Sequence, residues 1–168
     1  MKLVAFLVKS LPQQVAFAHC DIPCGVYDAY PAQMAAHTVL RMTQLLSGAE
    51  IPEGQKVESI EYTKHHNTVV RQVVVKEHHG GLVEGELGTL ENDYFKPEHH
   101  EKFPELQQFL KDAVKLSVET RQNINLEKAQ QLLEKVLLIS EIFYKTKGVT
   151  PIRVKSLYPT GGEMVVYK

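Results

Sequence analysis

The chain of 168 residues has no tryptophan and only two cysteines. Two cysteines are too few for the disulfide framework of a small secreted domain. No apolar run approaches the ~20 residues of a membrane-spanning helix, so we expect no membrane partner. The formal net charge is −1, which is not the footprint of a protein that binds nucleic acid. The length and the hydrophobic content of 43% are typical of one soluble globular domain.

Both cysteines lie in one short stretch, residues 19–28, with the sequence His-Cys-Asp-Ile-Pro-Cys-Gly-Val-Tyr-Asp. His19 stands directly before Cys20, and a proline and a glycine flank Cys24, which predicts a sharp turn there. The preceding Ala16-Phe17-Ala18 is a small-x-small pattern of the kind that peptidases cleave after. Cleavage by a maturation peptidase would give His19 a free amine beside its imidazole.

Such a mature end would gather nitrogen and sulfur donors within six residues. Two nitrogens and two thiolates in one turn favour a square-planar site, the geometry of Ni(II) or Cu(II) rather than of tetrahedral zinc. The imidazole of His19 could add an axial ligand and so support one-electron cycling. The alternative for Cys20 and Cys24 is a disulfide or a pair of buried thiols.

The first 18 residues are interpreted as a propeptide. A lysine near the start precedes a short apolar run, Leu3 to Val8, which Lys9 and Pro12 then interrupt. A secretory signal would usually have a longer apolar core. We therefore expect a cytoplasmic protein whose leader is removed for activation. An uncut N-terminal helix, or a signal peptide that exports the protein, are the alternatives.

Helical periodicity dominates the remainder of the chain. Apolar residues recur at helical spacing in four segments, and short polar connections join them, which favours an all-α, antiparallel four-helix bundle. The expected helices run from Pro31 to Ser47, from Ile60 to Leu90, from Pro104 to about Arg121, and from Leu126 to Lys147. The second is the least regular, because its valine run, residues 69–75, would also suit a strand.

The last 21 residues have a different pattern. Ile152–Lys155 and Met164–Tyr167 are β-prone and are separated by Pro159-Thr160-Gly161-Gly162, which predicts a short β-hairpin. An isolated hairpin is marginal in water, so it should pack on the bundle or on another subunit. The predicted organisation is therefore a leader (1–18), a hook (19–30), a bundle (31–147) and a C-terminal extension (148–168).

Three segments resemble one family. Residues 19–28 carry all fixed positions of His-Cys-Asp-x-Pro-Cys-Gly-x-Tyr-Asp, the nickel hook of nickel-containing superoxide dismutases. Residues 93–106 are similar to the family's Asp-Tyr-Phe-Lys-Pro-Pro-His-x-Glu-Lys-Tyr-Pro-x-Leu, and residues 142–147 are similar to its Ile-Phe-Trp-x-Thr-Lys. The resemblance covers roughly His19 to Lys147.

The resemblance implies an activity, a cofactor and an assembly. The activity is dismutation of superoxide, a small anion, to oxygen and hydrogen peroxide by Ni(II)/Ni(III) cycling in a homohexamer of four-helix subunits. The implied ligands are the amine and imidazole of His19, the amide nitrogen and thiolate of Cys20, and the thiolate of Cys24. Asp21 is expected to order the hook. Tyr27 and Tyr94 resemble tyrosines at the open face of the metal, although a tyrosine with a satisfied hydroxyl is also a common structural feature.

Two departures from the family bear on the axial ligand. The family holds its axial imidazole with a glutamate and an arginine, and the corresponding positions here are His37 and His79. Either these histidines take over that role, or the correspondence slips by one helical turn. The departure motivates two alternatives to the enzyme. One is a nickel- or copper-binding storage or sensor protein without turnover, and the other is a thiol redox protein.

Overall fold

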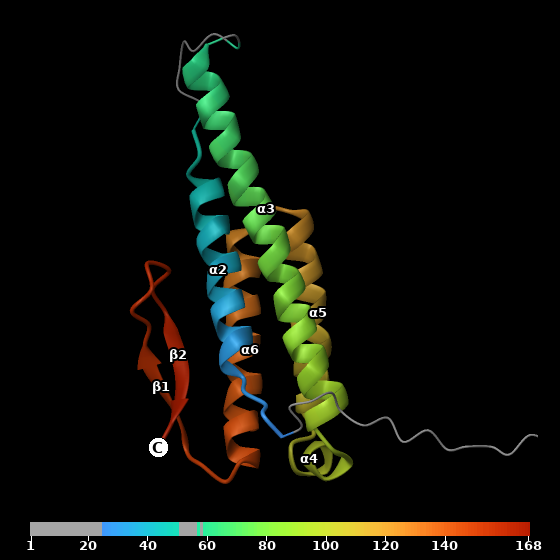
Figure 1. The fold of residues 1–168 in the computed structure, drawn as a ribbon. Helices are drawn as coiled ribbons and strands as arrows, with labels where there is room; N and C mark the ends of the chain where they lie inside the picture. Colours follow the sequence, from blue (N-terminus) through green and yellow to red (C-terminus); the bar gives the residue numbers. More distant parts are fainter. Residues whose placement is uncertain (1–24, 51–56, 58) are drawn as a thin grey trace, which may run out of the picture.

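The computed structural model describes residues 25–50, 57 and 59–168. Four long helices form the predicted antiparallel bundle: α2 (Tyr30–Ser47), α3 (Ile60–Thr89), α5 (Leu106–Gln122) and α6 (Leu126–Thr146). Helix α2 packs against α3 and α6, and α5 packs against the same two helices. The colours of Figure 1 show that the chain direction alternates from one helix to the next. The predicted fold class is confirmed.

The helices begin and end where local chemistry satisfies their free backbone groups. The side chain of Asn125 accepts a hydrogen bond from the Lys128 amide at 3.0 Å and caps α6. Ser59 caps α3 in the same way. At the other end of α6, Gly148 adopts a φ of +78°, a conformation that glycine reaches without steric cost.

A glycine allows α3 and α5 to approach closely. A Cβ built on Gly80 would lie 2.4 Å from Cγ of Arg121, and Ser117 donates a hydrogen bond to the Gly80 carbonyl at 2.9 Å. Arg121 then reaches Glu77 and Glu84 on α3. The valine run before this contact is helical, because the whole of residues 60–89 forms one helix.

The sequence gives the second helix an apolar set that includes Ile60, Val70, Val74, Val83 and Leu87, and as a core face this set is wrong in its first half. Ile60, Val70 and Val74 are exposed, whereas Val83 and Leu87 are buried. Figure 1 shows the start of α3 extending beyond the ends of the other helices. Within the part of the chain that the structure describes, these three apolar side chains are left exposed.

The connection between α3 and α5 contains more structure than expected. Helix α3 continues into a π-helical turn, η1 (Leu90–Tyr94), followed by a short helix, α4 (Pro97–Lys102). Pro97 therefore begins a helix, and the next long helix begins at Leu106 rather than at Pro104. None of the described helices is long and apolar enough to cross a membrane.

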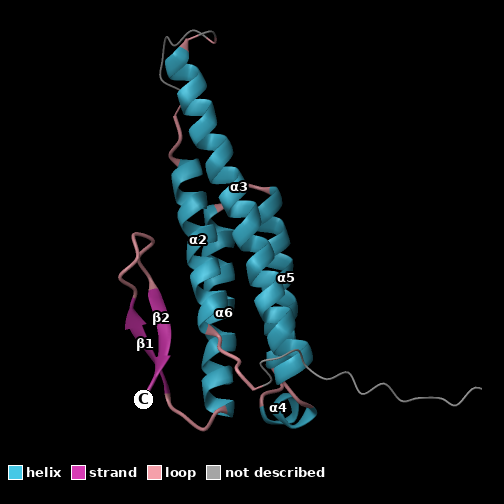
Figure 2. Cartoon of the chain, in the orientation of Figure 1, coloured by secondary structure: helices cyan, strands magenta, loops and turns pink. Residues whose placement is uncertain are grey.

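The C-terminal extension forms the predicted hairpin. Strands β1 (Pro151–Lys155) and β2 (Glu163–Tyr167) pair antiparallel, with Pro151 opposite Tyr167 and Lys155 opposite Glu163. Figure 2 shows the hairpin beside α2 and α6. The buried side chain of Val165 joins the core of the bundle, so the extension packs on its own subunit.

Candidate active site

The predicted metal ligands lie outside the described residues. His19, Cys20, Asp21 and Cys24 all precede Gly25, the first residue described. Gly25 has a φ of +92°, which a residue with a side chain rarely adopts. The chain therefore has a glycine at the position after Cys24 where the backbone takes this left-handed conformation.

The donor set suits nickel in its chemistry. His19 and the two cysteines would supply nitrogen and thiolate donors, which borderline and soft metal ions prefer over carboxylates. Within the described part of the chain, no group of three or more histidine, cysteine, aspartate or glutamate side chains could hold a metal ion. The residues before Gly25 are thus the metal-binding candidates that fit.

The two predicted tyrosines lie together. The ring centroids of Tyr27 and Tyr94 are 5.6 Å apart, although 67 positions separate them in the numbering. Tyr27 belongs to the hook stem, the name used here for residues 25–29, and Tyr94 ends η1. The stem therefore leaves the bundle beside the segment that carries the second matching motif.

The hydroxyl of Tyr94 has a defined direction. Thr146 donates its hydroxyl hydrogen to the Phe143 carbonyl at 2.6 Å, so its oxygen accepts the hydrogen of Tyr94 at 2.7 Å. The hydroxyl hydrogen of Tyr94 is therefore directed at Thr146, and for any further partner the Tyr94 oxygen has only its lone pairs. Tyr94 is thus suited to accept a hydrogen bond from water at the site rather than to donate one.

A carboxylate joins the hook stem to the end of α6. One oxygen of Asp28 accepts a hydrogen bond from the Tyr144 hydroxyl at 3.0 Å and another from the Tyr30 amide at 2.9 Å. Burial raises the pKa of Tyr144 well above its ordinary value, and the bond to Asp28 raises it further. Tyr144 therefore stays protonated and keeps donating to Asp28 across the physiological range.

A pocket of about 230 Å³ opens at this point. Its wall combines the stem with the end of α6 and the last strand: Tyr27, Asp28, Phe143, Tyr144, Lys147, Val149 and Tyr167. The ammonium group of Lys147 lies 4.6 Å from the centre of the Tyr94 ring and 5.4 Å from that of Phe143. Aromatic faces attract a cation, so they hold this charge at the rim of the pocket.

The sequence did not single out Tyr144, Lys147 or Tyr167 as site residues. Tyr144 and Lys147 lie in the matching segment at the end of the last helix, and that match was the available signal. Tyr167 has no such signal, because it comes from the extension. Only the packing of β2 beside α6 brings it to the pocket.

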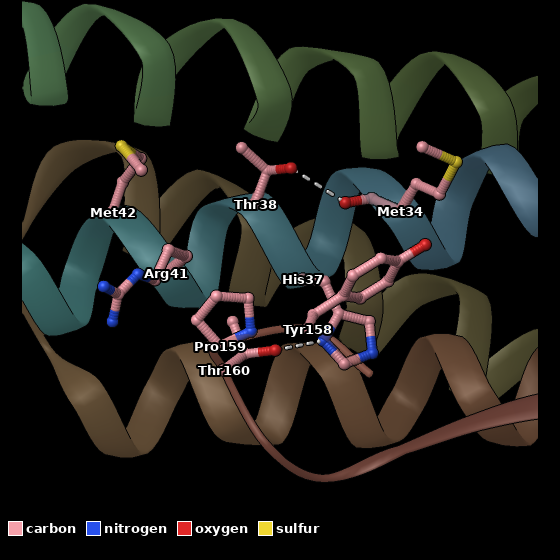
Figure 3. Close-up of a pocket in the computed structure, with 8 residues that line it drawn as sticks. All are labelled: Met34, His37, Thr38, Arg41, Met42, Tyr158, Pro159 and Thr160. Carbon is pink, nitrogen blue, oxygen red and sulfur yellow. Dashed lines mark hydrogen bonds between the residues drawn. The ribbon is translucent and has the colours of Figure 1, made fainter. Parts of the chain in front are cut away.

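His37 lies elsewhere, under the C-terminal hairpin. Its Nε2 donates to the Glu163 carbonyl at 3.0 Å, so in the neutral ring Nδ1 accepts from the Thr160 hydroxyl at 2.8 Å. Figure 3 shows the ring between α2 and the hairpin loop, beside Tyr158. To hold the His19 imidazole, as the sequence suggests, His37 would have to give up at least one of these bonds.

His79 is placed differently. Its Nδ1 donates to the Val75 carbonyl of its own helix at 2.9 Å, which leaves Nε2 as an acceptor in the neutral ring. The ring also lies edge-on to His78 at 5.3 Å. The structure therefore gives His37 and His79 separate partners, and of the two it is His79 that keeps a ring nitrogen for a further contact.

Comparisons with known proteins agree on one family. The sequence model of the family described as nickel-containing superoxide dismutase matches residues 14–147. The "Superoxide dismutase [Ni]" of Streptomyces coelicolor is 32% identical over 136 residues, which are 81% of this chain and 93% of the relative. That of Streptomyces seoulensis is 31% identical over the same shares.

Solved structures give the same result. The native nickel superoxide dismutase structure superposes with a TM-score of 0.63 at 32% identity, over 77% of this chain and 99% of its own. A structure with nickel ligation corresponding to the oxidised state superposes with a TM-score of 0.62 at 31% identity, over the same shares. The hairpin residues 148–168 lie beyond the segment that the family model matches.

Proposed function

This chain belongs to the nickel-containing superoxide dismutase family, and we propose that His19, Cys20 and Cys24 hold its nickel ion after a peptidase has removed residues 1–18. The chain is a nickel-dependent superoxide dismutase that converts superoxide to oxygen and hydrogen peroxide. The family match over residues 14–147 carries this conclusion. The alternatives of a storage protein or a thiol redox protein are not favoured.

The bound nickel supplies the one-electron exchange on which dismutation depends. The chain's own residues would hold it with the amine and imidazole of His19, the amide nitrogen of Cys20 and the thiolates of Cys20 and Cys24. Asp21 would order the backbone of the hook. Thiolates are the donors most sensitive to the peroxide product, so the hook must shield them.

The described residues would shape the approach of the substrate. Lys147 is exposed at the rim of the pocket beside Tyr27, and its positive charge would attract the superoxide anion. Tyr27 and Tyr94 would form the wall that orders water or the anion near the metal. Because the Tyr94 proton is directed to Thr146, Tyr94 would act here as an acceptor of hydrogen bonds.

The imidazole of His19 would need a partner to orient it, and we favour His79 over His37 for this role. His79 keeps one ring nitrogen as an acceptor, whereas both nitrogens of His37 bind the hairpin. Changing His79 to alanine should weaken the Ni(III) signal of the enzyme while Ni(II) stays bound. A His79→Ala enzyme with an unchanged signal and turnover would exclude the role.

The exposed apolar side chains of the first half of α3 support the proposed homohexamer. Ile60, Val70 and Val74 of α3, together with Val57 just before it, are all more than half exposed in the single subunit. A protein rarely leaves such a group uncovered, so we propose that this part of α3 packs against other subunits. Sedimentation of the unsubstituted chain and of Val70→Lys would test the assembly, and a hexamer unaffected by Val70→Lys would place the interface elsewhere.

The experiment that tests the function compares chains that differ only at the N-terminus. One chain begins at His19, a second begins at Ala18, and a third is the full precursor. If the free amine of His19 is a ligand, only the first should bind one nickel per subunit and dismutate superoxide, because a single extra residue converts that amine into an amide. Equal nickel content and turnover in all three would refute cleavage before His19. We also propose that this processing takes place in the cytoplasm.

A further inference from the structure

We propose that the C-terminal hairpin positions the metal-binding hook, acting through Tyr167 and Tyr144 on Asp28 of the hook stem. The inference rests on the proposed hook at residues 19–24. It adds a part of the chain beyond the family match, residues 148–168, to the machinery of the enzyme. Tyr144 and Tyr167 are positioning residues in this proposal, and neither is proposed to touch nickel or superoxide.

The hairpin is held against α2 by buried hydrogen bonds. The side-chain amide of Gln33 donates to the Val165 carbonyl at 3.1 Å and accepts from the Val165 amide at 2.8 Å. Gln33 is completely buried, and its side-chain amide makes the two hydrogen bonds to Val165 that the backbone of a neighbouring strand would make. Further along, His37 binds Thr160 and Glu163. Buried polar side chains whose donors and acceptors are all paired favour one packing arrangement, here that of the hairpin on α2.

The hairpin is also tied to α6 by one arginine. Arg153 of β1 contacts Glu141 at 2.6 Å and Glu134 at 2.8 Å, both on α6, and it contacts Glu163 across the hairpin at 3.4 Å. The hydrogen bonds to Glu134 and Glu141 raise the pKa of Arg153, so its charge is always present. Several charges in one network are worth more than an isolated surface pair. The hairpin is therefore held against both α2 and α6.

The free end of the hairpin reaches the stem. The ring of Tyr167, the last residue of β2, lies 5.1 Å from the ring of Tyr144, and the Lys168 amide donates to the Thr150 carbonyl at 3.0 Å. Tyr144 donates to Asp28, which also binds the Tyr30 amide at the start of α2. An unbroken series of contacts thus runs from β2 through Tyr144 to the stem.

Distance makes this contact relevant to the metal. Asp28 is four residues after Cys24, and an extended chain spans at most ~3.6 Å per residue, so the two backbones lie within about 14 Å of each other. Holding Asp28 therefore limits where the second thiolate can lie. A hydrogen bond to a carboxylate favours the conformation in which it forms by a factor of about ten or more. If this bond orders the stem before nickel binds, its loss should weaken nickel binding by a similar factor.

A purely structural role of the same residues predicts something different. In that case the removal of the Tyr144 hydroxyl would lower thermal stability and leave the affinity for nickel unchanged. In the positioning role, nickel affinity and the thiolate-to-nickel absorption bands change even where thermal stability does not. Tyr167 separates the two roles well, because its side chain is mostly exposed and its loss costs little core packing.

The test uses Tyr144→Phe and Tyr167→Ala in the chain that begins at His19. The matched control is Tyr158→Phe, which also removes a tyrosine hydroxyl that makes a 3.0 Å hydrogen bond, in this case to the Tyr30 hydroxyl. This change leaves both hydrogen bonds to Asp28 in place. Nickel affinity is measured by competition with a chelator. Hydrogen exchange of the peptide covering residues 25–33 is measured in the nickel-free protein.

We expect Tyr144→Phe to weaken nickel binding about tenfold and to speed exchange in this peptide, with a smaller effect in the same direction for Tyr167→Ala. The control should match the unsubstituted chain in both measurements. Folded Tyr144→Phe and Tyr167→Ala proteins with unchanged affinity and exchange would overturn the proposal. If the unsubstituted chain binds no nickel, the proposed function fails instead, and the exchange measurement still decides whether the hairpin orders the stem.

Discussion

His37 makes the attachment of the hairpin sensitive to acid. Burial lowers the pKa of its ring below the ordinary 6.5, and the bond to the Glu163 carbonyl opposes only part of that effect. The folded protein therefore binds the proton more weakly than the unfolded chain does. The contribution of His37 to stability is complete above about pH 6.5 and is lost as the pH falls through the lowered pKa. Between the two values, the free energy of unfolding should fall by about 1.4 kcal/mol per pH unit.

The hydrogen bonds explain why this loss acts on the hairpin. A protonated ring carries a hydrogen on Nδ1, so Thr160 can no longer donate to it and must turn its hydroxyl toward the Gly161 carbonyl at 3.3 Å. His37→Phe would remove both bonds at any pH while keeping a ring beside Tyr158. At about 1 kcal/mol for each bond, the variant should lose about 2 kcal/mol at pH 7.5. For a chain of this size that corresponds to a Tm lower by about 4–8 °C.

The assay needs a probe that reports on the hairpin alone. The chain has no tryptophan, and Leu157 in the hairpin loop is 98% exposed, so Leu157→Trp adds a single fluorophore at little cost. Urea unfolding is followed by its fluorescence and by helical circular dichroism between pH 5 and 8, at one fixed protein concentration. The hairpin signal should lose stability below pH 6.5 in the Leu157→Trp chain and should not do so once His37→Phe is added. The same pH dependence with and without His37 would refute the reasoning.

Three further predictions concern the metal and the core. Cys20→Ser and Cys24→Ser should each abolish nickel-dependent turnover, because a hydroxyl is a harder and weaker donor than a thiolate. Helical circular dichroism should stay unchanged in both variants. Substantial turnover in either variant would contradict ligation of nickel by two thiolates. Nickel removal by a chelator should stop turnover and leave helical circular dichroism unchanged, since the described core contains no metal site; a loss of helix would tie the metal to folding of the bundle. Lys76→Met should destabilise the protein by about 2 kcal/mol in thermal unfolding, because the buried ammonium group of Lys76 binds the carbonyls of Thr120, Arg121 and Asn123 at the end of α5. The control, Lys64→Met, changes an exposed lysine of the same helix and should have no effect. Equal Tm values for the two variants would show that the carbonyls find other partners.

The family and the bundle could be predicted from the sequence because their signals are local. A histidine followed by two cysteines four residues apart places the donors together whatever the rest of the chain does. Helical periodicity, a cap such as Asn125 and a terminating glycine such as Gly148 depend on neighbours within a few residues. The hairpin followed from alternation and from a turn of proline and glycine in the same way.

Contacts between distant segments were decided only by tertiary structure. The periodicity of α3 predicts an apolar face, but it cannot tell that Val70 and Val74 stay exposed in the folded subunit. The sequence correspondence placed His37 near the axial imidazole, yet both ring nitrogens bind residues more than 120 positions away. The physical reason is that a ring nitrogen binds whatever the packed chain brings within about 3 Å, and sequence spacing does not determine that partner. The bond from Tyr144 to Asp28 arises in the same way, because only the docking of the stem against α6 brings that hydroxyl and that carboxylate together.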